Sequence, residues 1–341
     1  MSKIKFAIIG CQHTHISTFI QEMLDLNYEC MGIYESENNK LASSISKQFN
    51  IPIIDNIDYL LGDQVDIIGC ADINNKKIDI IELCEKNNKH IMVDKPLVTN
   101  RIDYERLESV IRRGRIQIGL LLTERFRPAL YTLKKRIDIG DLGEIVHIGM
   151  RKPHRLSPSN RPHWFFSKNQ CGGIVVDLFI HDFDLLRWLT GMEIDLIQGY
   201  MSKNILPEYP DFYDVANLLV KMKGNVIAEL YGDWHTPNAS WTWGDGRIFV
   251  TETKGFAELR LEGDPLIEEF GLMIQVTHEL PPVKAKMEPN PSTVSQDFLN
   301  RINQEPHLIT HNDILQATKA TILADESVVI IHNQGGKHVR R

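Results

Sequence analysis

The chain has 341 residues, of which 43% are hydrophobic and 24% charged, and its formal net charge at pH 7 is −7. This length accommodates about two globular domains with full apolar cores, so the fold does not depend on disulfide bonds. The basic residues are scattered, and no apolar stretch approaches the roughly 18 residues of a membrane-spanning helix, so we expect neither nucleic acid nor a membrane as a partner.

Residues 1–122 alternate between strand-like apolar runs and segments with helical periodicity. Between positions 16 and 24, for example, apolar residues recur every three or four positions, which is typical of one face of a helix. Repeated β-α-β units of this length predict a parallel sheet that is covered on both faces. The expected strands are 4–9, 30–34, 52–54, 65–70, 90–93 and 116–122, and the expected helices are 16–24, 39–49, 78–86 and 100–113.

Residues 123–341 follow a different pattern. After a first helix, strand and long polar loop, strands succeed one another without helices between them, which predicts a largely antiparallel sheet. The sequence therefore predicts an α/β protein with an N-terminal Rossmann domain at 1–122 and a C-terminal α+β domain with a mostly antiparallel open sheet at 123–341. In the second domain the expected helices are 128–139, 174–189, 293–303 and 312–330, and the expected strands are 144–150, 195–201, 213–222, 226–232, 239–251 and 257–261.

The first strand ends at Gly10, where a Rossmann fold that binds a dinucleotide has its phosphate turn. Only this first glycine of the usual three is present, because bulkier residues follow it. Glu35 comes directly after the second strand, where an acid accepts hydrogen bonds from the adenosine ribose, although a solvated loop residue is the alternative. We expect the cofactor to be bound by Gly10, Gln12, His13, Thr14, Glu35, Ala71, Asp94 and Lys95.

Asp94, Lys95 and Pro96 follow the fifth expected strand. Proline fixes its own φ and biases the preceding residue away from the helical region. Lys95 is therefore expected at the carboxyl end of a parallel strand, where ligands of open α/β sheets bind. A functional lysine is favoured here over an ordinary surface lysine.

Asp177, His181 and Asp184 recur at helical spacing in an otherwise apolar segment. Polar groups in such a segment are costly unless they are paired or used. Two interpretations remain open: His181 is a structural histidine bonded to Asp177, or it is an acid/base that Asp177 orients or assists.

The chain resembles the glucose–fructose oxidoreductase/inositol dehydrogenase (Gfo/Idh/MocA) family over nearly its whole length. That family has a Glu/Asp-Lys-Pro motif after a Rossmann strand and a G-G-x-x-x-D-x-x-x-H-D helix in its second domain. This chain departs from the family in its first loop, where Gln12, His13 and His15 replace glycine-rich sequence, and Glu252 replaces a usual glycine. The matching segments are 94–96, 124–128, 172–182, 251–258 and 309–313.

The resemblance implies an NAD-dependent oxidoreductase that acts on a secondary alcohol of a sugar, cyclitol or related polyol. Lys95 and His181 then flank the substrate as catalytic residues, and Asp177 contributes to binding or proton transfer. NAD is expected rather than NADP, because Glu35 repels a 2′-phosphate. The resemblance also implies that 123–341 binds substrate and forms a homodimer or homotetramer. The loop 151–170 offers polar groups for such a substrate, namely His154, Arg155, Arg161, His163 and Trp164.

Two other functions stay open. A non-catalytic protein that senses a cofactor or sugar fits the fold, but it has no need of the set Lys95, Asp177 and His181. A metal-dependent lyase or hydrolase would use His13 and His15 with Asp177 and His181, although we expect no metal. The five cysteines form no C-x-x-C pair and the N-terminus lacks a signal-peptide pattern, so we expect a cytoplasmic protein.

Overall fold

The computed structural model describes residues 4–267 and 270–331. The chain divides into two compact units. The first unit takes in the described parts of Met1–Phe126, Asn169–Gly172 and Asn290–Lys319, and the second those of Arg127–Lys168, Gly173–Pro289 and Ala320–Arg341.

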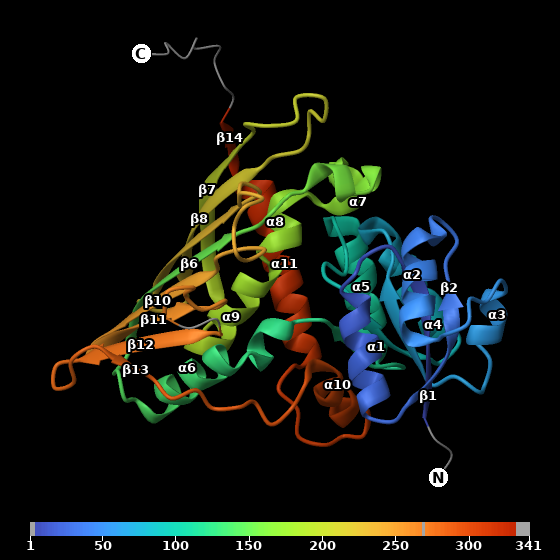
Figure 1. Ribbon diagram of the computed structural model, residues 1–341, viewed down its shortest axis with the longest axis horizontal. Helices are drawn as coiled ribbons and strands as arrows, with labels where there is room; N and C mark the ends of the chain where they lie inside the picture. The colour runs from blue at the N-terminus through green and yellow to red at the C-terminus, as the bar shows by residue number, and fades with distance from the viewer. Residues whose placement is uncertain (1–3, 268–269, 332–341) are drawn as a thin grey trace. The chain divides into compact units, whose positions relative to one another are not determined.

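The first unit is built on a parallel sheet that has five strands among the described residues (Figure 1). Its strand order is β2-β1-β3-β4-β5, so the order reverses beside β1. In open parallel sheets, ligands bind at the carboxyl ends of the strands at such a reversal. The strands are β1 (Lys5–Cys11), β2 (Glu29–Tyr34), β3 (Ile67–Ala71), β4 (His90–Val93) and β5 (Ile118–Leu120).

The helices of the first unit bury the apolar faces that the sequence predicts. The first helix, for instance, buries Ile16, Phe19, Ile20 and Met23 against the sheet. Right-handed crossovers require the first helix on one face of the sheet and the next crossover helices on the other. The helices are α1 (Ile16–Asp25), α2 (Asn39–Phe49), α3 (Ile57–Leu60), α4 (Lys77–Lys86) and α5 (Arg101–Arg113).

One strand expected in the first unit is wrong. Residue Ile53 forms only an isolated parallel bridge with Ile33. The neighbouring Pro52 has no N–H group with which to extend a ladder. The short helix α3, which follows soon after, was not expected.

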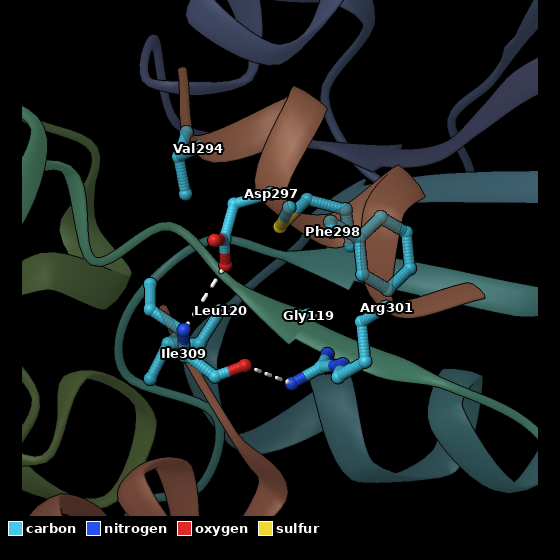
Figure 2. A pocket seen from close by; sticks show the side chains of 8 residues that line it. Gly119, Leu120, Val294, Asp297, Phe298, Arg301 and Ile309 are labelled. Atoms are coloured by element: carbon cyan, nitrogen blue, oxygen red, sulfur yellow. Dashed lines mark hydrogen bonds between the residues drawn. The ribbon is translucent and has the colours of Figure 1, made fainter. Parts of the chain in front are cut away.

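Residues 290–319 belong to the first unit through α10 (Val294–Ile302), which packs against α1 and β4. Arg301 donates a hydrogen bond to the backbone carbonyl oxygen of Ile309 (2.9 Å). The backbone N–H group of Ile309 in turn donates to the Asp297 carboxylate (3.1 Å), and both bonds are drawn in Figure 2. The cavity beside these residues has room for no more than about one water molecule. This buried network is therefore structural, since it holds a loop to the sheet and leaves no space for a substrate.

The second unit is built on a mixed sheet, with nine strands among the residues described, in the order β13-β12-β11-β10-β6-β9-β8-β7-β14. The pairs β6–β9 and β14–β7 are parallel, and the others are antiparallel. The predicted fold class, a Rossmann-like parallel sheet followed by a mostly antiparallel one, is confirmed. The strands are β6 (Ile145–Pro153), β7 (Ile194–Ser202), β8 (Val215–Met222), β9 (Ile227–Asp233), β10 (Arg247–Glu252), β11 (Gly255–Arg260), β12 (Leu272–Thr277), β13 (Val283–Lys284) and β14 (Val329–Ile331).

Helices α6 (Pro128–Ile139), α8 (Gly173–Leu178) and α9 (Ile180–Thr190) pack on one face of this sheet (Figure 1). Burial alternates along the strands, as in β8, because every second side chain points toward those helices. The other face carries exposed apolar side chains. They include Leu196, Tyr200, Leu219, Ile227, Phe249 and Phe256.

Three boundaries in the second half of the chain differ from expectation. The helix expected at 174–189 is divided at Phe179, which separates α8 from α9. The strand expected at 239–251 begins only at Arg247, because the preceding segment is a series of turns. The last helix, α11 (His311–Ser327), ends before a β-branched run that forms β14, and β12 and β13 were not expected.

Candidate active site

The carboxyl end of β1 approaches the turn after β3 very closely. Gly10 has a φ of +81°, and a Cβ atom there would lie 2.5 Å from the Cβ of Asp72. A glycine is therefore required for both its conformation and its lack of a side chain. The loop after Gly10 is fixed by two hydrogen bonds from Gln12. The backbone N–H of Gln12 donates to the Ala71 carbonyl oxygen (2.8 Å), and the side-chain amide of Gln12 donates to the Asn38 carbonyl oxygen (3.2 Å).

Glu35 is buried, with 8% of its surface exposed, so it is not a solvated loop residue. One carboxylate oxygen accepts a hydrogen bond from the Cys11 N–H (2.6 Å), and the other accepts one from the Glu37 N–H (2.7 Å). The acid at the end of β2 is thereby fixed beside the glycine turn. Each oxygen keeps a lone pair that a ribose hydroxyl can use.

Asp72, which sequence analysis did not single out, lies across from Gly10 and is also buried. Burial raises its pKa to about 6, while a hydrogen bond from the Ile73 N–H (2.6 Å) lowers it. The carboxyl edge of the first sheet, where the strand order reverses, therefore carries a second acid in addition to Glu35. Its sequence signal was weak, because acids after strands are common in solvated turns.

Lys77 fixes the Asp94-Lys95-Pro96 turn through hydrogen bonds to its backbone. Its side chain is fully buried, and its ammonium group donates to three successive backbone carbonyl oxygens, those of Asp94 (2.8 Å), Lys95 (3.3 Å) and Pro96 (3.1 Å). The Lys95–Pro96 peptide bond is cis, and only 8% of Lys95 is exposed. The lysine expected at the end of β4 is thus part of a fixed turn. Lys77 itself was missed, because a lysine that opens a helix is normally solvated.

Both carboxylate oxygens of Asp94 face imidazole rings. The Oδ2 atom lies 3.0 Å from Nδ1 of His13, and the Oδ1 atom lies 3.0 Å from Nδ1 of His15. Burial raises the pKa of Asp94, but His15 and His13 lower it, and the net result is a pKa well below the ordinary value. Burial lowers the pKa of His13 to about 4. The two histidines that replace glycine-rich sequence are therefore organised around one ionised carboxylate.

In the second unit, α8 and α9 carry the other expected catalytic residues. Asp177 lies near the end of α8 with 6% of its surface exposed, and His181 lies in the first turn of α9 and is half-buried. Gly173 has a φ of +80°, a conformation that favours glycine, which explains the glycine at which α8 begins. Asp182 is almost fully buried and forms an ion pair with Lys152 (3.6 Å), a partner on β6 that the sequence did not reveal.

The expected loop 151–170 starts later than predicted, because β6 extends to Pro153, and the segment 154–168 packs on an aromatic cluster of the second unit. The Arg161 guanidinium lies over the rings of Phe165 (4.2 Å) and Trp234 (5.5 Å). Arg155 donates to the carbonyl oxygens of Ser240 (2.7 Å) and Thr242 (3.1 Å). Both arginines therefore have structural roles in shaping this loop.

The site residues expected from the sequence divide between the two units. Gly10, Gln12, Ala71 and Glu35 meet at the carboxyl edge of the first sheet, and Asp94 joins His13 in the same unit. Thr14 lies exposed in the loop before α1. Lys95 belongs to the first unit, and Asp177 and His181 belong to the second.

A glycine turn after the first strand and a buried acid after the second define a dinucleotide-binding protein of the Rossmann class. Two family models match the chain: "Oxidoreductase family, NAD-binding Rossmann fold" over residues 4–117 and "GFO/IDH/MocA C-terminal domain" over residues 130–258. Together they cover more than half of the chain, which therefore belongs to the GFO/IDH/MocA oxidoreductase family. The predicted family is confirmed, and so is NAD as the cofactor of its first domain.

Individual relatives agree with this assignment. The chain is 30% identical over 139 residues to scyllo-inositol 2-dehydrogenase (NAD(+)) of Bacillus subtilis, which covers 39% of this chain and 38% of that protein. It is 25% identical over 211 residues to the rhizopine catabolism protein MocA of Rhizobium meliloti, covering 61% of this chain and 63% of the relative. The chain thus spans less than two thirds of either relative's length.

The fold also matches solved structures. An aldose-aldose oxidoreductase from Caulobacter crescentus superimposes with a TM-score of 0.78 at 17% identity, covering 95% of this chain and 97% of that one. At this identity the likeness concerns the fold alone. Within the part of the chain that the structure describes, no helix is both long and apolar enough to cross a membrane.

Proposed function

We propose that the protein is an NAD-dependent oxidoreductase that transfers a hydride between nicotinamide and a secondary alcohol of a sugar, cyclitol or related polyol. The observation that carries the proposal is the fixed Asp94-Lys95-Pro96 turn. It puts Lys95 at the carboxyl end of β4, in the same sheet as the glycine turn after β1. The carboxyl ends of parallel strands are where such sheets bind their ligands.

The residues of the first unit fit NAD. Gly10 permits close approach of the backbone at the phosphate turn, and the buried Glu35 keeps acceptors for ribose hydroxyls. A negative carboxylate at that position disfavours a 2′-phosphate. Lys76 is paired with Glu37, so this neighbouring cation is already engaged. NAD is therefore favoured over NADP.

NAD, when bound, supplies the acceptor for the hydride. In our proposal His181 accepts the hydroxyl proton during oxidation, since imidazole is well suited to proton transfer near neutral pH. Lys95 donates a hydrogen bond to the same oxygen and stabilises its developing negative charge. Asp177 orients or assists His181. A sensor protein would need none of these three groups.

The substrate class rests on the relatives. They include a scyllo-inositol 2-dehydrogenase and a myo-inositol 2-dehydrogenase, whose names give a cyclitol as the substrate. The loop 151–170 is rich in polar and aromatic side chains, which suits a ligand with several hydroxyl groups. A small polyol is therefore the substrate that we propose.

We further propose that the protein is a homodimer or homotetramer. The sheet face opposite α6, α8 and α9 exposes large apolar side chains, among them Tyr200 (58% exposed) and Leu219 (47%). A second copy that packs against this face would remove that apolar surface from water. All five cysteines are free thiols, which fits a reducing compartment, and we propose a cytoplasmic location.

The test is a turnover assay of the full chain against a panel of sugars and cyclitols, with NAD and NADP in parallel. Reduced nicotinamide is followed by its absorbance. We expect turnover with at least one polyol and tighter binding of NAD than of NADP. Cofactor binding without turnover on any panel member would favour a sensor, and tenfold tighter binding of NADP would overturn the cofactor assignment.

A further inference from the structure

Three side chains from two distant segments converge in the first unit. His13 and His15 lie between β1 and α1, and Asp94 follows β4. Each histidine Nδ1 atom is 3.0 Å from one oxygen of Asp94, and one ligand atom from each of the three side chains lies within 4.8 Å of the other two. Across residues 4–267 and 270–331, no other group of three His, Cys, Asp or Glu side chains has this arrangement.

These distances suit a bound metal ion. Zinc binds imidazole nitrogen and carboxylate oxygen at about 2.0–2.2 Å, so two ligands of one tetrahedral ion lie about 3.3 Å apart. The two 3.0 Å separations run to different oxygens of Asp94, and the three ligand atoms lie within 4.8 Å of one another, so the exposed His15 ring would shift as the three side chains converge on one ion. Two imidazoles and one carboxylate are a donor set that divalent transition metals prefer. The carboxylate also brings one negative charge to balance part of the ion's charge.

The site is fixed on one side and open on the other. Asp94 has 1% of its side chain exposed, and its backbone carbonyl oxygen accepts a hydrogen bond from Lys77. The side chain of His13 is 19% exposed and that of His15 is 48% exposed. An ion can therefore arrive from the histidine side, and water can complete its coordination.

We propose that His13, His15 and Asp94 form a binding site for one divalent transition-metal ion of the zinc type. The two Nδ1 atoms and the Asp94 carboxylate ligate the ion, and its remaining positions accept water or another oxygen ligand. In the metal-free protein a ring nitrogen that hydrogen-bonds to Asp94 must carry a proton, because a carboxylate only accepts; the His13 Nδ1 atom also lies 3.4 Å from the His15 N–H group, which donates to it. Binding the ion replaces such a proton. His13 and Asp94 are also among the residues expected to bind the cofactor, but metal binding is measured without NAD, so its test does not depend on the proposed dehydrogenase activity. The inference revises the expectation from sequence that no metal is bound.

The test is a titration of the full chain, freed of metal by a chelator, with Co²⁺ and then Zn²⁺. Cobalt in a site with nitrogen and oxygen ligands gives visible absorption bands, and calorimetry gives the affinity and stoichiometry of zinc. We expect about one ion per chain, with zinc displacing cobalt from the same site. No saturable binding to the unaltered chain by either ion would overturn the proposal.

Two substitutions separate metal binding from hydrogen bonding. In His13→Asn and His15→Asn, the amide nitrogen takes the place of Nδ1 and still donates to Asp94, but it has no lone pair for a metal. We expect each variant to bind zinc at least about tenfold more weakly, while the melting temperature of the metal-free protein changes little. His278→Asn, which alters an exposed histidine of the second unit, is the matched control and should bind zinc like the unaltered chain.

His15→Asn is the more decisive of the two variants. Nearly half of the His15 side chain is exposed, so we expect the fold to tolerate a substitution at this position. Unchanged zinc affinity in folded His15→Asn would show that Asp94 serves these histidines only as a hydrogen-bond acceptor. Equal weakening in His278→Asn would likewise overturn the proposal, because it would point to scattered surface binding.

Discussion

The Nζ atom of Lys77 lies 2.8 Å from the backbone carbonyl oxygen of Asp94, and this contact fixes the turn that carries Lys95. The lysine is fully buried, and its charge is stabilised by three carbonyl oxygens that accept its hydrogen bonds and by the nearby carboxylates of Asp94 and Asp72. Buried charges are stable only when they are well hydrogen-bonded. Lys77 is therefore a positioning residue for the turn, and it does not itself touch the substrate in our proposal.

Lys77→Met is expected to lower the free energy of unfolding by about 3 kcal/mol, because buried carbonyl oxygens lose their donor. It should also lower kcat, since Lys95 is no longer held. Lys89→Met is the matched control: this buried lysine also donates to backbone carbonyl oxygens, those of Gly62 and Val65. Urea unfolding and steady-state kinetics should show that Lys89→Met loses stability but keeps kcat. Equal kcat in the two folded variants would contradict a positioning role for Lys77.

Glu252 predicts a pH dependence of stability. It is 5% exposed, and among the described residues neither of its carboxylate oxygens has a hydrogen-bond partner. Burial, with Glu144 and Asp141 nearby, raises its pKa to about 7 from the ordinary value of 4.5. The unfolded chain therefore loses this proton at lower pH than the folded chain does, so stability falls as pH rises from about 4.5 to about 7.

Glu252→Gln removes this dependence. The variant should be more stable than the unaltered protein at pH 8, by on the order of 3 kcal/mol, and the difference should vanish near pH 4. Urea unfolding at several pH values measures it. A stability difference that stays constant with pH would mean that Glu252 does not titrate in this range.

The exposed apolar face of the second unit's sheet leads us to expect a homodimer or homotetramer. Leu219→Asp would place a charge on that face and should shift the protein toward the monomer, as measured by light scattering at micromolar concentration. Gln48→Asp, which places the same residue at an exposed position of α2 in the first unit, is the control for general surface effects. A monomeric unaltered protein at that concentration would refute the proposed oligomer.

The sequence predicted the local elements of the site better than its long-range contacts. The strand ends at Gly10 and Glu35 follow from hydrophobic period and turn chemistry, and the structure has them at one edge of the sheet. The pairing of His15 with Asp94 joins residues 79 positions apart, and no local pattern encodes it. The break at Phe179 could not be predicted either, because the apolar run continues through this position without a proline or glycine to mark an interruption.

Lys95 gives a kinetic prediction. Lys95→Ala should lower both kcat and kcat/KM by roughly 10²–10³, because the lost charge acts on an oxygen that becomes more negative in the transition state. Lys95→Arg should restore only part of the rate, since a planar guanidinium cannot replace a compact ammonium. Steady-state kinetics with the best polyol of the panel gives the comparison. Full rescue by arginine would mean that charge alone suffices at this position.

The most direct measurement is single-turnover hydride transfer by folded His181→Ala, with its melting temperature and NAD affinity taken on the same preparation. If His181 accepts the proton, the variant should bind NAD nearly as well as the unaltered protein, and its rate of hydride transfer should fall by roughly 10²–10⁴. If His181 is a structural histidine, the melting temperature should fall instead, and hydride transfer per folded molecule should be close to normal. That second result would contradict our account and remove His181 from the reaction.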